Sequence, residues 1–170
     1  MRKIKSFTID HMTLLPGVYL SRLDRVSRHD TLEEMGKPVP HGEIPESELF
    51  PISTYDIRIT RPNFEPVMST GEIHTIEHLG ATYLRNREDL KYRIIYWGPM
   101  GCRTGFYLIL SGDNPLCEVT KLMIDTFSFI ADFEGEIPGA TPSECGNYSD
   151  MDLPAAKIRA KKYLEILEKL

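Results

Sequence analysis

The sequence predicts an α+β fold, a two-layer sandwich in which helices pack on one face of a mainly antiparallel sheet. Several short runs of β-branched and aromatic residues alternate with polar ones and end at Gly or Pro, which is typical of strands. Three longer segments instead carry apolar residues at helical spacing. Two of the strand-like runs are joined by a tight turn at 98–101, and so short a connection requires antiparallel pairing.

Length and composition favour one domain spanning residues 1–170. The chain is 41% hydrophobic and 26% charged, which is ordinary for a globular protein. Its net charge of −5 gives no basic surface of the kind that nucleic-acid binding requires. No long apolar run predicts a membrane segment, and the basic N-terminus is not followed by an apolar stretch. Because the three Cys also lack disulfide-scaffold spacing, we expect a cytoplasmic protein.

The first third of the chain predicts strands that flank a long loop. Residues 3–9 and 17–23 alternate as strands do, with a Pro-Gly turn signal between them. Residues 27–53 are rich in Pro and Glu and have little to bury, so we expect an acidic loop. Its two imidazoles, His29 and His41, are expected to be solvated.

Residues 52–60 predict a half-buried strand, because apolar and polar side chains alternate along it. The apolar face comprises Tyr55, Ile57 and Ile59, and the polar face comprises Asp56, Arg58 and Thr60. Arg58 is interpreted either as a solvated strand residue or as an anchor for an anionic or hydroxylated ligand.

A capping box of the form Ser-x-x-Glu and an apolar stripe predict a helix at about 70–86. His74 and His78 are one turn apart on this helix, so both imidazoles can reach one metal ion. Glu77 flanks the metal position without having to be a ligand, and is placed to move protons. The motif His-x-x-Glu-His alone is not specific, because a helix surface can carry these residues by chance.

The next segment predicts a strand, a tight turn and a second strand, with Cys102 after the turn. Gly98, Gly101 and Gly105 surround this thiol, and such small residues let the backbone approach a ligand closely. Most free Cys are small buried hydrophobes. We favour the interpretation of Cys102 as a reactive thiol.

The last third predicts two helices joined by a loop. Pro115 marks the start of the first helix, and Cys117 in its first turn is expected to pack in the core. The loop at 136–148 contains Cys145, whose thiolate could complete a His2Cys set that leaves a fourth metal position open for catalysis. The final helix begins at Asp152.

Together these pieces resemble the S-ribosylhomocysteine lyase (LuxS, autoinducer-2 synthase) family. The likeness covers nearly the whole chain, and several independent motifs in the same order are far more specific than His-x-x-Glu-His alone. The matching stretches are Ser6-Phe7, Asp10-His11, Asp56-Ile57-Arg58, His74–Leu79, Gly98–Leu108 and Glu144-Cys145-Gly146.

The resemblance implies a homodimer with two metal sites at its interface. Each subunit would hold one Fe(II), or Zn(II) or Co(II) as isolated, through His74, His78 and Cys145. The substrate would be S-ribosylhomocysteine, and the products would be homocysteine and 4,5-dihydroxy-2,3-pentanedione, the precursor of autoinducer-2. This carbon–sulfur lyase would serve quorum-sensing signal synthesis and methyl-cycle recycling without any other cofactor.

The resemblance also implies roles for single residues. Cys102 and Glu77 would transfer protons during aldose–ketose isomerisation and β-elimination, with Cys102 acting mainly in the first isomerisation. The positions that match substrate-binding residues are Ser6, His11, Arg58 and Arg85. The first three match positions that line the ribose, and the last matches one near the homocysteine end.

Two features depart from the family pattern. The chain between His11 and Arg58 is longer than in short family members, which makes the 27–53 loop a candidate insertion. Tyr96 stands six residues before Cys102, where several members have Asp, so we expect one polar substrate contact to differ.

Two other functions compete with this interpretation. His-x-x-Glu-His is also the inverzincin motif of metallopeptidases, which would be expected to use a distal carboxylate as third ligand and would leave Cys102 unexplained. A structural zinc protein would need a fourth protein ligand, for which His11 is the nearest candidate.

Overall fold

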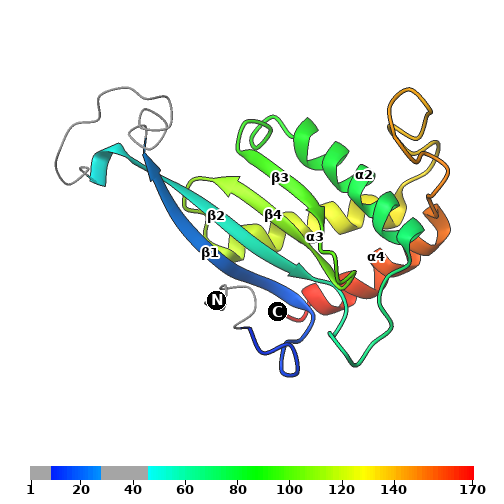
Figure 1. Cartoon of the computed structure of the whole chain (residues 1–170), viewed down its shortest axis with the longest axis horizontal. Helices are drawn as coiled ribbons and strands as arrows, with labels where there is room; N and C mark the ends of the chain where they lie inside the picture. Colours follow the sequence, from blue (N-terminus) through cyan, green and yellow to red (C-terminus); the bar gives the residue numbers. More distant parts are fainter. Residues whose placement is uncertain (1–8, 28–45) are drawn as a thin grey trace, which may run out of the picture.

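The computed structural model describes residues 9–27 and 46–170. These residues form an antiparallel sheet of four strands with three α-helices, which confirms the predicted α+β class (Figure 1). The elements in chain order are β1 (Gly17–Ser27), η2 (Glu46–Glu48), β2 (Leu49–Arg58), α2 (Thr70–Asn86), β3 (Ile94–Pro99), β4 (Gly105–Ser111), α3 (Leu116–Asp132) and α4 (Leu153–Leu167). The strand predicted at 3–9 falls almost entirely outside the described residues.

The strands lie in the order β1-β2-β4-β3. β1 pairs with β2 along its whole length, from Gly17 opposite Arg58 to Ser27 opposite Leu49. Only Ser53–Arg58 of β2 also pairs with β4, so the outer halves of β1 and β2 form a two-stranded arm at the left of Figure 1. The predicted loop at 27–53 therefore extends too far at its C-terminal end, where β2 begins at Leu49. Its last residues pair with β1, because main-chain hydrogen bonding does not depend on the Pro and Glu content that suggested a loop.

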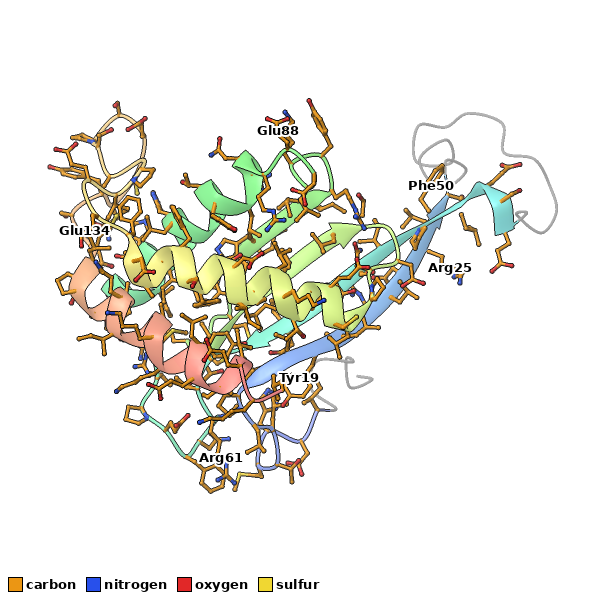
Figure 2. All side chains as sticks on the ribbon, turned by 180° about the vertical axis from the view of Figure 1, so that it is seen from behind. Tyr19, Arg25, Phe50, Arg61, Glu88 and Glu134 are labelled. Carbon is orange, nitrogen blue, oxygen red and sulfur yellow. The ribbon has the colours of Figure 1, made fainter. Side chains whose placement is uncertain are left out.

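Helices α3 and α4 lie across one face of the sheet, which is the face turned toward the viewer in Figure 2. The core between the layers is aromatic, with Trp97 of β3 stacked on Phe106 of β4 at a centroid distance of 4.6 Å. Helix α2 packs on β3, and a Cβ atom at Gly80 would lie only 2.6 Å from the Trp97 ring nitrogen. Glycine at this position therefore lets the helix that carries both His residues approach the sheet closely.

The strand predicted to be half-buried, β2, is buried on both faces at its C-terminal end. Its polar side chains Asp56 and Arg58 are only 3% and 1% exposed. They neutralise each other through an ion pair of 2.5 Å, and Tyr19 and Tyr107 are the register partners of Asp56 on the neighbouring strands. The interpretation of Arg58 as a solvated strand residue was therefore wrong.

The helix boundaries follow local sequence signals. Ser69 caps α2 and forms the predicted capping box with Glu72, and Asp152 caps α4. Pro115 is itself the N-cap of α3, so the helix begins at Leu116, one residue later than predicted. Cys117 is exposed and not buried in the core, because it lies on the outward side of the first turn of α3. Within the described residues, no helix is long and apolar enough to cross a lipid bilayer.

Candidate active site

Helix α2 presents two imidazoles to a thiol from the loop between α3 and α4. The ring centroids of His74 and His78 are 4.7 Å apart, and Cys145 Sγ lies 3.3 Å from His74 Nε2. One ligand atom of each residue lies within 4.8 Å of the other two. The structure thus brings the three predicted metal ligands together.

Hydrogen bonds fix the orientation of both imidazoles. His74 Nδ1 lies 2.9 Å from the carbonyl oxygen of Asp150, and His78 Nδ1 lies 2.8 Å from the carbonyl oxygen of Pro138. A carbonyl oxygen only accepts, so each Nδ1 carries the hydrogen and each Nε2 keeps its lone pair. This is the tautomer that a neutral imidazole needs in order to bind a metal through Nε2.

The loop between α3 and α4 supplies the third predicted ligand and both carbonyl groups, and its C-terminal end is hydrogen-bonded to α2. The Asp152 amide donates to Thr75 Oγ1 at 2.9 Å, and Thr70 donates to the Asp150 carboxylate at 3.1 Å. Gly139 adopts φ +75°, and a Cβ there would lie 3.0 Å from His78 Nδ1. Glycine is therefore required where the loop passes the imidazole.

The donor set fits a divalent transition metal. Two imidazoles and one thiolate suit Zn(II) and other first-row ions. Among the described residues, no further His, Cys or acidic side chain joins the cluster. The structural-zinc interpretation lacks its fourth ligand, since His11 is not in the cluster, and the peptidase interpretation lacks its carboxylate ligand.

Glu77 lies on α2 between the two His residues in sequence and is half-buried. At 100° per residue its side chain is offset by about 60° from His74 around the helix, so the carboxylate flanks the cluster without joining it. The placement agrees with a group that moves protons beside a metal.

Cys102 lies in the turn before β4, beside a buried polar chain. Its Sγ is 3.1 Å from Thr104 Oγ1 and 3.8 Å from Nη1 of Arg58. Arg58 also donates to Thr104 Oγ1 at 2.5 Å, and Asp56 accepts from the guanidinium at 2.5 and 3.1 Å. Sequence analysis selected Arg58 and Cys102 but did not select Thr104 or Asp56 as site residues.

The surroundings of Cys102 favour its thiolate. Burial by itself would raise the pKa of this thiol, but hydrogen bonding from Thr104 and the positive charge of Arg58 outweigh burial and hold the pKa below its ordinary value. Arg103, which follows Cys102 in sequence, is not among the causes of the shift.

Cys102 opens into a hollow of about 320 Å³, lined also by Thr104, His11, Asn63 and Glu65. The structure thus places the predicted substrate residue His11 beside the predicted catalytic thiol.

A neighbouring hollow of about 240 Å³ is lined by Thr70 and Ile73 of α2 and by Gly101 and Arg103 of the turn that carries Cys102. The first turn of the metal helix and the turn bearing the thiol therefore border a common surface depression.

The remaining predicted site residues have different outcomes. Ser6 lies outside the described residues. Arg85 is in the last turn of α2 and donates to the carbonyl of Ile94 at 3.4 Å, so its substrate contact stays a prediction. Tyr96 is 44% exposed on β3, and its altered substrate contact also stays a prediction.

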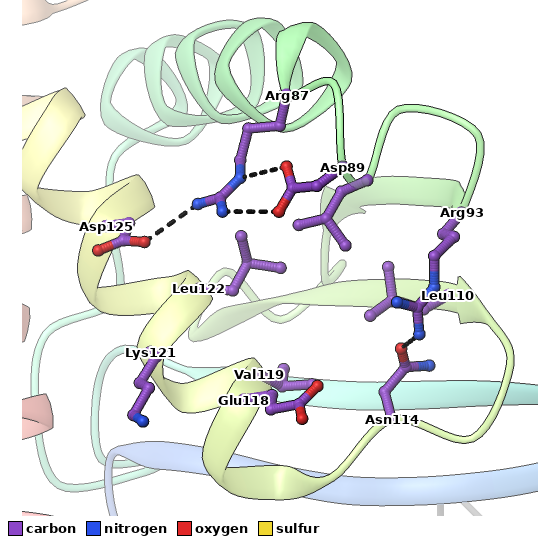
Figure 3. A pocket seen from close by; sticks show the side chains of 11 residues that line it. Arg87, Asp89, Arg93, Leu110, Asn114, Glu118, Val119, Lys121, Leu122 and Asp125 are labelled. Carbon is purple, nitrogen blue, oxygen red and sulfur yellow. Dashed lines mark hydrogen bonds and ion pairs between the residues drawn. The ribbon is translucent and has the colours of Figure 1, made fainter.

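A larger cavity of about 390 Å³ lies at the opposite end of β4 (Figure 3). The guanidinium of Arg87 forms ion pairs with Asp89 and Asp125 at 2.9 and 3.0 Å. Arg93 donates a hydrogen bond to the side chain of Asn114. None of its lining residues is a Cys or His, so this cavity carries none of the predicted chemistry despite its size.

Comparison with known proteins finds relatives of the whole chain. The sequence model of the S-ribosylhomocysteinase (LuxS) family matches residues 43–169. S-ribosylhomocysteine lyase of Clostridium beijerinckii is 50% identical over 96% of this chain and 90% of its own length. The lyase of Clostridium acetobutylicum is 48% identical over 100% of this chain and 94% of its own length, and that of Phocaeicola vulgatus is 49% identical over 99% and 92%.

Proposed function

The chain belongs to the LuxS family of S-ribosylhomocysteine lyases, and from this premise we propose that it cleaves S-ribosylhomocysteine to homocysteine and 4,5-dihydroxy-2,3-pentanedione, the autoinducer-2 precursor. The observation that carries the proposal is the His74, His78 and Cys145 cluster on a chain that also presents a free thiol of depressed pKa at Cys102. Such a lyase would supply a quorum-sensing signal and return homocysteine to the methyl cycle.

We propose that His74, His78 and Cys145 hold one Fe(II) per subunit, which Zn(II) or Co(II) can replace. The fit rests on the two free Nε2 lone pairs and the adjoining thiol. When bound, such an ion supplies Lewis-acid stabilisation of negative charge on the sugar oxygens. If Fe(II) is the native ion, air should inactivate the enzyme faster than its zinc- or cobalt-loaded form, and equal decay would argue against iron.

Cys102 is proposed as the base of the first isomerisation. Moving the ribose carbonyl from C1 to C2 requires that a proton leave C2 and that C1 gain one. A thiolate accepts the first proton and can return it to the neighbouring carbon. The hydrogen bond with Thr104 and the guanidinium of Arg58 keep the sulfur ionised for this task.

Glu77 is proposed to assist the later proton transfers and the β-elimination, in which a C4 proton leaves and homocysteine departs from C5 as a thiolate. Its half-buried carboxylate flanks the cluster on α2. The sugar chain would lie between this carboxylate and Cys102, with its hydroxyl groups toward Ser6, His11 and Arg58.

We propose that the active unit is a homodimer joined through the sheet face that α3 and α4 leave uncovered (Figure 1). The register places Tyr19 beside Asp56, and Tyr96 beside Ile109, on that face. Tyr19 and Tyr96 are 37% and 44% exposed in the single chain. Exposed aromatic residues on a sheet face are typical of subunit interfaces.

The cytoplasm is the proposed location of the reaction. Both Cys102 and Cys145 must stay reduced to act as base and ligand, and all three Cys of the chain are free. Thiols persist in a reducing compartment.

Release of free thiol from S-ribosylhomocysteine tests the proposal. The metal-loaded protein should release homocysteine, and Cys102→Ala and Glu77→Gln should each lower turnover by about 10² to 10⁴ while keeping the metal and the fold. Cys117→Ala is the matched control, because this thiol is exposed on α3 and should be near neutral. A Cys102→Ala variant that releases homocysteine at the wild-type rate would refute the proposed mechanism.

A further inference from the structure

Thr104 is the residue through which the buried ion pair reaches the Cys102 thiol. It is 4% exposed, and its carbonyl oxygen accepts from the amides of Ile59 and Thr60 at 3.0 and 3.1 Å. Two main-chain hydrogen bonds therefore fix its backbone to the segment that follows β2. The position of the Thr104 side chain is therefore set by the backbone.

The direction of the hydrogen bonds at Thr104 Oγ1 follows from the chemistry of its neighbours. Arg58 Nη1 lies 2.5 Å from this oxygen, and a guanidinium can only donate. The oxygen therefore accepts from Arg58, and its own hydrogen must point elsewhere. Cys102 Sγ, at 3.1 Å, is the other polar side-chain atom within hydrogen-bonding distance among the described residues.

A protonated Cys102 would leave one hydrogen-bonding group of this cluster without a partner. Its S–H would donate to the second lone pair of Thr104 Oγ1, and the threonine hydrogen would then lack a side-chain acceptor among the described residues. A thiolate instead accepts from the hydroxyl while the hydroxyl accepts from the guanidinium. The whole chain then runs in one direction.

Asp56 orients Arg58, the first donor of that chain. Its carboxylate oxygens accept from Nε and Nη2 of Arg58, which holds the guanidinium with Nη1 toward Thr104. Cys102 Sγ is 3.1 Å from Thr104 Oγ1 but 3.8 Å from Nη1 of Arg58. The closer hydrogen-bond partner of the sulfur is thus the threonine hydroxyl and not the arginine.

We propose that Thr104 is a positioning residue that donates its hydroxyl hydrogen to Cys102 and so keeps this sulfur a thiolate, in a chain of donors that starts at Arg58. Its consequence for turnover rests on the proposed lyase function. The ionisable groups that also face the sulfur are His11 and Glu65 across the hollow and Tyr107 on β4, and none of these takes the hydrogen bond described here.

Cys102 alkylation measures this effect directly. The metal-loaded full chain is treated with iodoacetamide over a range of pH, and the Cys102 peptide is quantified by mass spectrometry. In Thr104→Val, which keeps the side-chain shape but loses the hydroxyl, the midpoint of the alkylation profile should rise by about one to two pH units, as expected for the loss of one charge-assisted hydrogen bond. Thr104→Ser should retain a midpoint near that of the wild type.

Two controls separate this effect from general damage. The exposed thiol of Cys117 is an internal reference in every sample and should keep its midpoint. Thr126→Val removes another fully buried hydroxyl, which donates to the carbonyl of Leu122 at 2.7 Å, and should leave Cys102 unchanged. Should the valine variant not fold, Thr104→Ala provides the same comparison with Thr104→Ser.

A wild-type midpoint in Thr104→Val, or an equal displacement in Thr104→Ser, would overturn the proposal. In turnover, the deficit of Thr104→Val should shrink as the pH rises, because hydroxide restores the thiolate, whereas a structural defect would persist at every pH. Alkylation does not require lyase activity. A wild-type protein that releases no homocysteine would therefore refute the proposed function and leave the alkylation result to be judged by itself.

Discussion

Hydrogen bonds decide which ring nitrogen each His in the candidate metal cluster can offer to an ion. The two Nδ1 atoms are held by carbonyl groups of Pro138 and Asp150, so the loop determines which nitrogen of His74 and His78 is free. The same loop provides Cys145, whose Sγ also receives the Asn147 amide at 3.5 Å. The loop therefore orients all three ligands.

Substitution of Cys145 should abolish tight metal binding. We expect Cys145→Ala to lose tightly bound divalent metal, because two imidazoles alone remain in the cluster. Metal content after desalting measures the loss, with Cys102→Ala as the control that should keep one ion per chain. Full retention of metal by Cys145→Ala would remove this thiol from the ligand set.

Gly139→Ala should weaken metal binding without touching a ligand. The residue sits at φ +75°, which costs roughly 1–2 kcal/mol for a residue with a Cβ, and the new methyl group would lie 3.0 Å from His78 Nδ1. Displacing the carbonyl of Pro138 should lower metal affinity by about 10- to 100-fold. Competition with a chelator measures this affinity.

Gly146→Ala is the matched control for Gly139→Ala. It lies in the same loop, has no left-handed φ, and a Cβ there meets no atom within 4 Å. We expect its metal affinity to equal that of the wild type. Equal affinity in both variants would show that the close approach of the loop at Gly139 does not matter for metal binding.

At the scale of elements, α2 is the platform of the site, and it is anchored at its first turn. The Ser69 and Glu72 capping box satisfies the amides there, and Glu72 also accepts from Arg159 of α4 at 3.0 Å. Capping and the ion pair therefore act on one carboxylate. This ties the helix that carries His74 to the helix that follows the ligand loop.

The stability difference between the wild type and Glu72→Gln should depend on pH. Burial would raise the pKa of Glu72, but hydrogen bonds from Ser69 and Arg159 outweigh it and lower the pKa below its ordinary value. Because the folded-state pKa is depressed, the stabilisation is present above the unfolded pKa and is lost as the pH falls through the folded pKa. Glutamine can keep the cap but loses the charge.

Thermal melting of both proteins across acid pH checks this prediction. The wild type should melt about 2–4 °C higher than Glu72→Gln at neutral pH, and the difference should close between about pH 5 and pH 3. A difference that does not depend on pH would show that the ionised carboxylate contributes nothing beyond its shape.

At the scale of the whole molecule, the helices cover only one face of the sheet, and the other face carries exposed aromatic residues beside the Cys102 hollow. Arg58 belongs to that second face by its position in β2 and contacts Cys102. A partner subunit seated there would border the site. The arrangement supports a dimer whose interface and active site are continuous.

Tyr96→Arg should dissociate the proposed dimer, because it places a charge among exposed aromatic residues that the second copy would bury. Sedimentation of the purified protein at several concentrations measures the oligomeric state. Tyr92→Arg makes the same change at a residue that is 88% exposed just before β3, and it should remain dimeric. A wild-type protein that sediments as an active monomer would refute the dimer.

The sequence by itself determined the helices, most of the strands and the local part of the site. The capping box fixed the start of α2, and the i, i+4 spacing then fixed two metal ligands on one face, because helix geometry is set by local bonds. The fold class followed from the same periodicities. The glycine-rich turn marked Cys102 as the candidate catalytic thiol.

Only the tertiary structure decided which distant residues meet. Asp56 and Arg58 are two residues apart on β2, so this pair could have been placed on one face from the sequence. Cys102 and Thr104 meet instead in a turn where Arg103 has φ +59°, which the strand period does not describe. What joins the pairs is the register between β2 and β4, which sets Arg58 opposite Gly105. Register depends on packing across the whole sheet and not on either strand alone, which is why a strand predicted to be half-buried is buried on both faces where it meets Cys102.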